Sequence, residues 1–207
     1  MKIMIGMPSR LATVEMLTMR SLMNDTMELA KRGDVFTFFD ESGRTDIARA
    51  RKEIVEAFRE KDHDFLIFVD DDVFWEAGAL LKLIDHPQDF VAGAYRKKTE
   101  KIDWPVGWIP DPEKKGLHAV NGLLEVAHAP GGFWCLSKAC IEQMWANYGN
   151  TLFNRVEDAN GVYSEDISFC GKWRAIGGKV WIDPEIKTGH VGKTTYTGSI
   201  GDWLRNR

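Results

Sequence analysis

Cysteines and long apolar stretches are scarce in this 207-residue sequence, and basic residues are not in excess. The three cysteines, Cys135, Cys140 and Cys170, show no CxxC spacing, which favours reduced thiols. The longest useful apolar run covers residues 65–69, far short of the roughly 20 residues that a membrane helix needs. The N-terminal segment breaks at Pro8, too early for a signal peptide. We therefore expect a cytoplasmic chain without a membrane span.

The charge balance argues against a strongly basic nucleic-acid-binding domain. There are 27 lysines and arginines against 31 aspartates and glutamates, which gives a formal net charge of -4. A local basic patch remains compatible with this total. Hydrophobic residues make up 44% and charged residues 28%, the composition of an ordinary globular protein. The length suits one domain with a full hydrophobic core.

Segments typical of strands and helices alternate along the sequence. We expect strands at residues 2–7, 35–39, 65–69, 90–95 and 179–182, and helices at residues 13–31, 45–60, 77–84, 138–145 and 165–176. Three of these helices have a suitable N-cap residue, namely Thr45, Ser137 and Ser164. Residues 97–118, rich in Pro, Lys and Trp, are expected to form a loop or hairpin. This order predicts an α/β fold with a mainly parallel central sheet flanked by helices, which binds ligands beyond the carboxyl ends of its strands.

Three adjacent carboxylates, Asp70, Asp71 and Asp72, directly follow the apolar strand at residues 65–69. Their mutual repulsion needs a compensating charge, and a divalent cation is the obvious candidate. Because side chains two residues apart on an extended segment point to the same side, Asp70 and Asp72 can address one site. Magnesium and manganese accept a few carboxylates and keep positions open for phosphates. An acidic turn that caps the following helix is the alternative.

Together with other segments, these aspartates give the chain a resemblance to the GT-A glycosyltransferases, especially the inverting family 2 type and its small phage or bacterial relatives. The resemblance extends over nearly the whole chain, in the segments IARAR at 47–51, FLIFVDDDV at 65–73, VAGAY at 91–95, GGF at 131–133 with Ser137-Lys138, YSEDISFC at 163–170, Asp183-Pro184 and GHVG at 189–192. It implies a single Rossmann-like GT-A domain. Residues 1–95 would bind the nucleotide-sugar, 96–190 the acceptor, and 191–207 would form a C-terminal lid or tail. For a phage-encoded chain, the expected location is the host cytoplasm.

The resemblance also implies how the reaction proceeds. Asp70, Asp72 and His190 would hold Mn²⁺ or Mg²⁺, which neutralises the diphosphate that leaves. Asp166 is the candidate general base for an acceptor hydroxyl, with inversion at the sugar carbon, and Glu165 would hold nearby structure or the acceptor. Two plainer interpretations stay open: His190 as a solvated loop histidine, and Glu165-Asp166 as a charge pair at a helix start.

A UDP-sugar is the expected donor, and the resemblance places its base and ribose at the end of the first strand. Lys193 and Tyr196 would close over the diphosphate as a lid, and Gly131-Gly132 would let the backbone approach the donor sugar. For each position a surface charge, a plain turn or an irregular tail is the alternative. The complete set of donor-binding candidates is Pro8, Ser9, Arg10, Asp40, Arg49, Asp71, Gly131, Gly132, Lys193 and Tyr196.

The acceptor is either a glycan or a hydroxymethylated base in DNA. For DNA, Arg96, Lys97, Lys98 and Lys101 supply local positive charge, and Trp104 and Trp108 are candidates to stack on a flipped base. The sequence lacks the QxxRW motif and the membrane segments of polymerising synthases, which argues against processive synthesis. It also lacks the glycine-rich basic loop of nucleotidyltransferases. A non-catalytic nucleotide-sugar-binding module is the remaining alternative.

Overall fold

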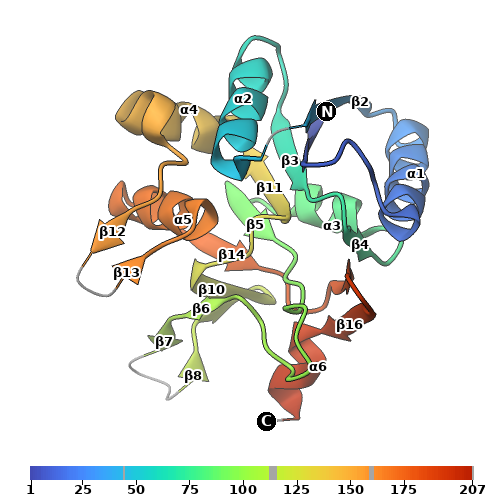
Figure 1. The fold of residues 1–207 in the computed structure, drawn as a ribbon, viewed down its shortest axis with the longest axis vertical. Coiled ribbons are helices and arrows are strands. Elements are labelled where there is room, and N and C mark those ends of the chain that lie inside the picture. The colour runs from blue at the N-terminus through green and yellow to red at the C-terminus, as the bar shows by residue number, and fades with distance from the viewer. Residues whose placement is uncertain (44, 112–115, 159–160, 207) are drawn as a thin grey trace.

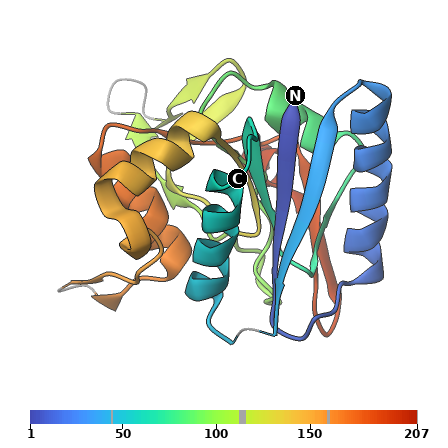
Figure 2. The same ribbon diagram turned by 90° about the horizontal axis from the view of Figure 1, so that it is seen from above.

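The computed structural model describes residues 1–43, 45–111, 116–158 and 161–206. Its centre is a nine-stranded sheet with helices packed on both faces (Figures 1 and 2). The strands follow one another across the sheet as β2 (Val35–Ser42), β1 (Lys2–Ser9), β3 (Phe65–Val69), β11 (Phe133–Ser137), β5 (Phe90–Ala92), β14 (Val180–Ile182), β10 (Leu123–His128) and β6 (Gly107–Trp108), with β9 (Ala119–Val120) paired to β10.

Helices and smaller sheets surround this centre. The helices are α1 (Met16–Lys31), α2 (Ile47–Arg59), α3 (Ala79–Asp85), α4 (Lys138–Tyr148), α5 (Glu165–Ala175), α6 (Ile200–Arg205) and a 3₁₀ turn at Gly149–Thr151. The smaller sheets are β4 (Val73–Trp75) with β15 (Lys187–Val191) and β16 (Thr195–Ser199), β7 (Pro110–Asp111) with β8 (Gly116–Leu117), and β12 (Glu157–Asp158) with β13 (Gly161–Val162). In the part of the chain that the structure describes, none of the helices is long and apolar enough to cross a membrane.

The central sheet is mixed, although most of the sheet was expected to be parallel. Strands β2, β1, β3, β5 and β14 do run the same way, but β11 lies between β3 and β5 and is antiparallel to both. β10 is also reversed, relative to β14. The sequence pattern missed β11 because its apolar run is short and leads directly into a helix. Hydrophobicity also carries no information about the direction of a strand.

Two apolar clusters cover the two faces of the sheet. On one face, Ile54, Val55 and Phe58 of α2 pack against Leu66 and Phe68 of β3. On the other face, α1 and α3 pack against the alternate side chains of β3, which are Ile67 and Val69. Strand β3 is therefore apolar throughout because both of its faces are covered. Its carboxyl end delivers the three aspartates to the edge of the sheet, as the sequence predicts.

Of the three expected N-cap residues, Ser137 and Ser164 are at the N-cap positions of their helices, and Thr45 is not. Ser137 caps α4 as expected, because its hydroxyl oxygen accepts from the N–H of Cys140 at 3.0 Å. For α2 the cap is Asp46 rather than Thr45, and the Asp46 carboxylate accepts from the N–H of Ala48 at 3.1 Å. Ser164 is the N-cap residue of α5, although its hydroxyl donates to Asp166 instead of capping a backbone N–H.

The C-terminal segment is regular structure rather than an irregular tail. Strand β15 pairs with β4 on one side and with β16 on the other, and α6 follows directly. The pairing places His190 opposite Val73, immediately after the three aspartates. Glycines at 189, 192 and 198 obscure the alternation from which these strands would be predicted. Residues 97–118 contain short strands, as expected for a hairpin region, and residues 112–115 of that stretch lie outside the described residues.

A buried carboxylate ties α1 to the segment that follows the aspartates. Asp25 is fully buried and accepts hydrogen bonds from the Trp75 indole at 2.9 Å, the Gly78 N–H at 2.6 Å and the Leu80 N–H at 2.9 Å. It thereby satisfies the free N–H groups at the start of α3 and orients the Trp75 ring. The carboxylate holds the β4–α3 segment on the helix that covers it.

We predict that Asp25→Ala lowers the free energy of unfolding by about 3 kcal/mol, because one partly buried and two buried donors lose a charged acceptor. Urea denaturation measures this change. Asn24→Ala is the control, since Asn24 is exposed on the same helix and its loss should cost less than ~0.5 kcal/mol. Equal stability of the two variants would contradict the role given to Asp25.

Candidate functional site

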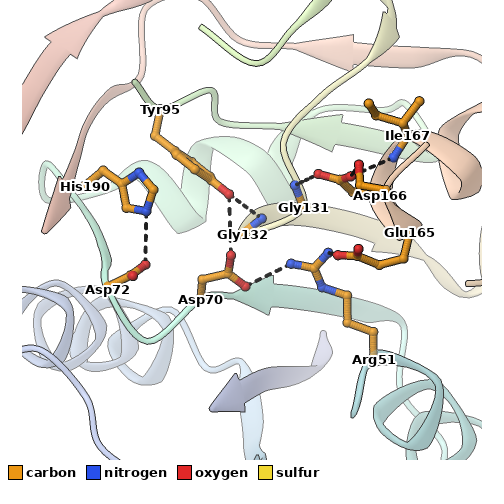
Figure 3. A network of polar contacts seen from close by, with 11 residues as sticks. Arg51, Asp70, Asp72, Tyr95, Gly131, Gly132, Glu165, Asp166, Ile167 and His190 are labelled. Atoms are coloured by element: carbon orange, nitrogen blue, oxygen red, sulfur yellow. Dashed lines mark hydrogen bonds and ion pairs between the residues drawn. The ribbon is translucent and has the colours of Figure 1, made fainter. Parts of the chain in front are cut away.

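The three consecutive aspartates after β3 have three different partners (Figure 3). Asp70 faces Arg51 and Tyr95, Asp71 faces Ser9, and Asp72 faces His190. The three carboxylates therefore do not point into one common site. No group of three His, Cys, Asp or Glu side chains suited to a metal occurs among the described residues, and the set of Asp70, Asp72 and His190 stays a prediction.

Arg51 lies at the centre of the site, on α2. Its side chain is 2% exposed and bridges two carboxylates: Nη1 donates to Glu165 at 2.7 Å and Nη2 donates to Asp70 at 3.0 Å (Figure 3). Burial opposes the charge of the guanidinium, but the carboxylates of Asp70 and Glu165 outweigh it and raise the pKa of Arg51. Burial also raises the pKa of Glu165, against the effect of Arg51. The bridge connects the end of β3 to the start of α5.

The turn before β11, at Gly131 and Gly132, is hydrogen-bonded to Asp166 and Tyr95. The Tyr95 hydroxyl donates to Asp70 at 3.4 Å and accepts from the Gly132 N–H at 3.0 Å, and burial raises the pKa of Tyr95. The Gly131 N–H donates to Asp166 at 3.2 Å. The half-buried Asp166 carboxylate also accepts from the Ile167 N–H at 2.8 Å and from the Ser164 hydroxyl. Asp166 is thereby fixed beside the network with part of its surface open.

The two glycines of this turn are required by the protein's own side chains. A Cβ atom on Gly131 would lie 2.2 Å from Nη1 of Arg51, and one on Gly132 would lie 2.4 Å from Oδ2 of Asp70. Both distances are far below van der Waals contact. The backbone approaches the buried ion network so closely that a side chain at either position would displace it.

Asp72 and His190 form a second, more exposed group. Nε2 of His190 lies 3.2 Å from the Asp72 carboxylate, and Nδ1 lies 2.9 Å from the carbonyl oxygen of Arg96. Lys98 forms an ion pair with the other oxygen of Asp72. Burial alone would raise the pKa of Asp72, but the hydrogen bonds from His190 and Lys98 outweigh it and lower the pKa. One carboxylate and one imidazole fit a divalent ion that takes its remaining ligands from phosphate and water. The Lys98 ammonium shows that this position attracts positive charge.

Donor-side candidates at the end of β1 lie beside a cavity of about 300 Å³. Ser9 is buried, and its hydroxyl donates to Asp71 at 2.7 Å. Burial raises the pKa of Asp71, partly offset by this hydrogen bond. Ser9 and Asp40 both line the cavity, and most of the other lining residues are apolar. A few polar groups in a mainly apolar lining suit a planar base attached to a polar ribose.

The remaining donor-side candidates differ in their positions. Pro8 is buried in β1, and Arg10 is exposed immediately after that strand. Arg49 points away from the network and pairs with Glu53 at 2.9 Å on the same helix. Lys193 is exposed in the turn between β15 and β16, and Tyr196 lies on β16 with the Arg96 guanidinium 5.7 Å from its ring centre.

The expectation that Trp104 stacks on an acceptor is wrong for this structure. Trp104 is 4% exposed and belongs to the main hydrophobic core, so its ring faces have no access to a ligand. Trp108 is half-buried and stacks on Trp203, with ring centres 6.4 Å apart. Neighbouring prolines and charges suggested a surface position for both rings. The chain instead folds them against the C-terminal helix and the sheet.

Arg51 and Tyr95 were not among the sequence candidates for the site, and Lys98 was named only among the basic residues for a DNA acceptor. A signal for Arg51 was present, because it lies three, four and seven residues before Ile54, Val55 and Phe58, which form the apolar face of α2. An arginine on the apolar face of a helix needs buried carboxylate partners. Tyr95 and Lys98 follow β5 in an extended segment, and only the three-dimensional structure brings them to the aspartates.

We predict that Arg51→Met lowers the free energy of unfolding by about 3–5 kcal/mol, because it leaves two carboxylates without their cation. Arg49→Met is the matched control, two residues earlier on the same helix. Its side chain is 58% exposed, so its loss should cost no more than ~0.5 kcal/mol. Thermal and urea denaturation of both variants test this, and similar losses in the two would show that Arg51 does not hold the network.

Comparisons with known proteins inform on the fold alone. No protein family and no curated protein matches the sequence. Among solved structures the chain is similar to A197 from STIV, with 20% identity and a TM-score of 0.62 over 97% of this chain and 91% of that one. It is also similar to GalNAc-T7 in a crystal structure with UDP, GalNAc and Mn²⁺, with 13% identity and a TM-score of 0.57 over 92% of this chain and 44% of that chain. The fold of this chain is thus a mixed α/β fold of the GT-A-like kind.

Proposed function

We propose that this chain transfers a sugar from a nucleotide-sugar donor to an acceptor hydroxyl. The observation that carries the proposal is the network in which Arg51 joins Asp70 to Glu165, beside Asp166 on one side and the Asp72–His190 pair on the other. These groups come from α2, the end of β3, α5 and β15, which are far apart in the sequence. A candidate base and a candidate cation site thus meet at one edge of the sheet.

A UDP-sugar is the proposed donor. GalNAc-T7, which shares this fold, was crystallised with UDP, GalNAc and Mn²⁺. In our proposal the nucleoside lies in the cavity at Ser9 and Asp40, next to Asp71, and the diphosphate extends toward Asp72. In the proposal Arg10, Lys193 and Tyr196 contact the phosphates. The role proposed for Pro8, Gly131 and Gly132 is to shape the backbone around the donor.

Asp72 and His190 are the residues that would hold Mn²⁺ or Mg²⁺. A bound metal ion would supply positive charge to the diphosphate as the bond to the sugar breaks. Lys98 neutralises Asp72 in the structure and is placed to pair with a phosphate oxygen of the donor. Asp70 would have an indirect role. Its hydrogen bonds with Arg51 and Tyr95 fix the segment on which Asp72 lies.

Asp166 is the proposed general base. The acceptor oxygen attacks the anomeric carbon as the bond from that carbon to the diphosphate oxygen breaks, and the hydroxyl proton passes to the Asp166 carboxylate. A single displacement of this kind inverts the configuration at that carbon. Hydrogen bonds from Gly131 and Ile167 orient the carboxylate, while Arg51 holds the neighbouring Glu165 in place. Glu165 is 6% exposed, so we assign it to positioning rather than to direct acceptor contact.

The acceptor is a glycan or a hydroxymethylated base in DNA. Exposed cations at Lys97 and Lys101 and the half-buried Trp108 lie on the segment after β5, and they would suit an anionic acceptor. A non-catalytic nucleotide-sugar-binding module is the second candidate function. The cavity beside Ser9 favours it as much as it favours an enzyme. Measured turnover of a nucleotide-sugar therefore distinguishes the transferase from the non-catalytic module.

The first test is a panel of nucleotide-sugars with Mn²⁺, read as release of nucleoside diphosphate. We expect release with a UDP-sugar and a loss of at least ~100-fold in Asp72→Ala, because the diphosphate loses its cation site. Asp85→Ala, an exposed carboxylate paired with Arg32, is the control and should keep full activity. Donor binding without release would support the non-catalytic module, and full activity of Asp72→Ala would overturn the metal assignment.

Asp166→Asn should abolish transfer to the acceptor that a subsequent screen of glycans and modified DNA identifies. The amide cannot take the proton, so we expect a loss of about 10²–10⁴-fold in rate. Donor affinity, measured by calorimetry, should stay within a few-fold. Glu157→Gln, which changes an exposed carboxylate on β12, serves as the control. Transfer at the wild-type rate by Asp166→Asn would exclude it as the base.

A further inference from the structure

A stripe of exposed methionines runs along α1. Met16, Met19, Met23 and Met27 are 71, 37, 57 and 57% exposed. Their spacing of three or four residues places them on one side of the helix. The stripe adjoins the side of α1 that faces β2, because Met19 and Met23 line the same cavity as Leu22 and Thr26. A soluble surface helix normally presents polar residues here.

Strand β2 continues this apolar surface at the edge of the central sheet. It is the terminal strand, hydrogen-bonded to β1 alone among the described strands, and it is eight residues long. Phe36 and Phe38 are 37 and 51% exposed and line the cavity together with Met19 and Met23. Figures 1 and 2 both show α1 and β2 together at one side of the molecule. The edge has no proline, and its centre has no charged residue, so the devices that normally prevent strand pairing are missing there.

We propose that this α1–β2 face binds a second copy of the same chain, with the two β2 strands pairing antiparallel about a twofold axis. An edge strand offers backbone donors and acceptors that match a copy of itself, so the contact is self-complementary and closed. A twofold axis perpendicular to the sheet puts both α1 helices on the same face, where their methionine stripes meet above Phe36 and Phe38. This face shares Met19, Met23, Phe36 and Phe38 with the cavity that we propose for the nucleoside. The dimer is measured without a donor, so its test does not depend on the proposed function.

The cations where α1 leads into β2 are already paired within the same copy. Lys31 pairs with Glu28, and Arg32 pairs with Asp34 and Asp85. Charge therefore does not select the direction of pairing. The antiparallel direction follows from the twofold axis perpendicular to the sheet, which keeps both α1 helices on one face.

The exposed apolar area is sufficient for a stable contact. Taking about 200 Å² for a fully exposed Met or Phe side chain, the four methionines and two phenylalanines expose on the order of 600 Å² per copy. Two copies would bury about 1,200 Å², the lower end of the range for specific interfaces, before the backbone of β2 is included. A small ligand in the cavity would cover only part of this area.

Sedimentation equilibrium of the full chain tests the proposal. We expect a mass of twice 23.5 kDa for the wild type. Met23→Lys and Phe38→Lys should each raise the dimer dissociation constant at least ~10-fold, because each places a charge in the apolar contact. The control is Val162→Lys, which changes an equally exposed apolar residue on β13 and should leave the dimer intact. Circular dichroism verifies that every variant is folded.

A wild-type chain that remains at 23.5 kDa up to high concentration would overturn the proposal. A dimer that is unaffected by both lysine variants would also overturn it, because the contact would then lie on another face. Loss of the dimer in Met23→Lys but not in Phe38→Lys would reject the pairing of β2 strands. Loss of the dimer in both, with Val162→Lys unchanged, would support the arrangement.

Discussion

The buried guanidinium of Arg51 is the interaction on which the arrangement of the site depends. It lies between Asp70 at the end of β3 and Glu165 at the start of α5, and it is almost completely enclosed. A carboxylate left without a partner at this depth would cost several kcal/mol, so neither segment can move without the other. The glycine turn before β11 closes the arrangement from the remaining side, since Gly131 and Gly132 bring their backbone N–H groups to Asp166 and Tyr95.

This network changes the explanation of the three adjacent aspartates. The sequence suggested that one divalent cation compensates all of their repulsion. In the structure each carboxylate has its own partner: Arg51 for Asp70, the Ser9 hydroxyl for Asp71, and Lys98 with His190 for Asp72. Each carboxylate thus has a partner within the chain, and of the two proposed metal carboxylates only Asp72 lies outside the buried network.

Much of the fold could be predicted from the sequence, because local signals determine it. The apolar run at residues 65–69 is β3, Ser137 caps α4, and α5 begins directly at Glu165. The direction of β11 and the burial of Trp104 could not be predicted, since both depend on contacts between distant segments. The burial of Arg51 rather than Arg49 could have been predicted from helix geometry. Two residues along a helix correspond to a rotation of about 200°, so only one of the two can share the apolar face.

The same network separates two kinds of position at the edge of the sheet. Arg51 and Glu165 are enclosed, and together with the partly exposed Asp70 they neutralise one another. Asp72, His190 and Asp166 are each only partly buried, and they lie on either side of the enclosed group. Arg51 bonds to both Asp70 and Glu165, and these residues are next to, or two residues from, Asp72 and Asp166 in the sequence. Under the proposed function, the buried arginine would therefore set the relative positions of the cation site and the base.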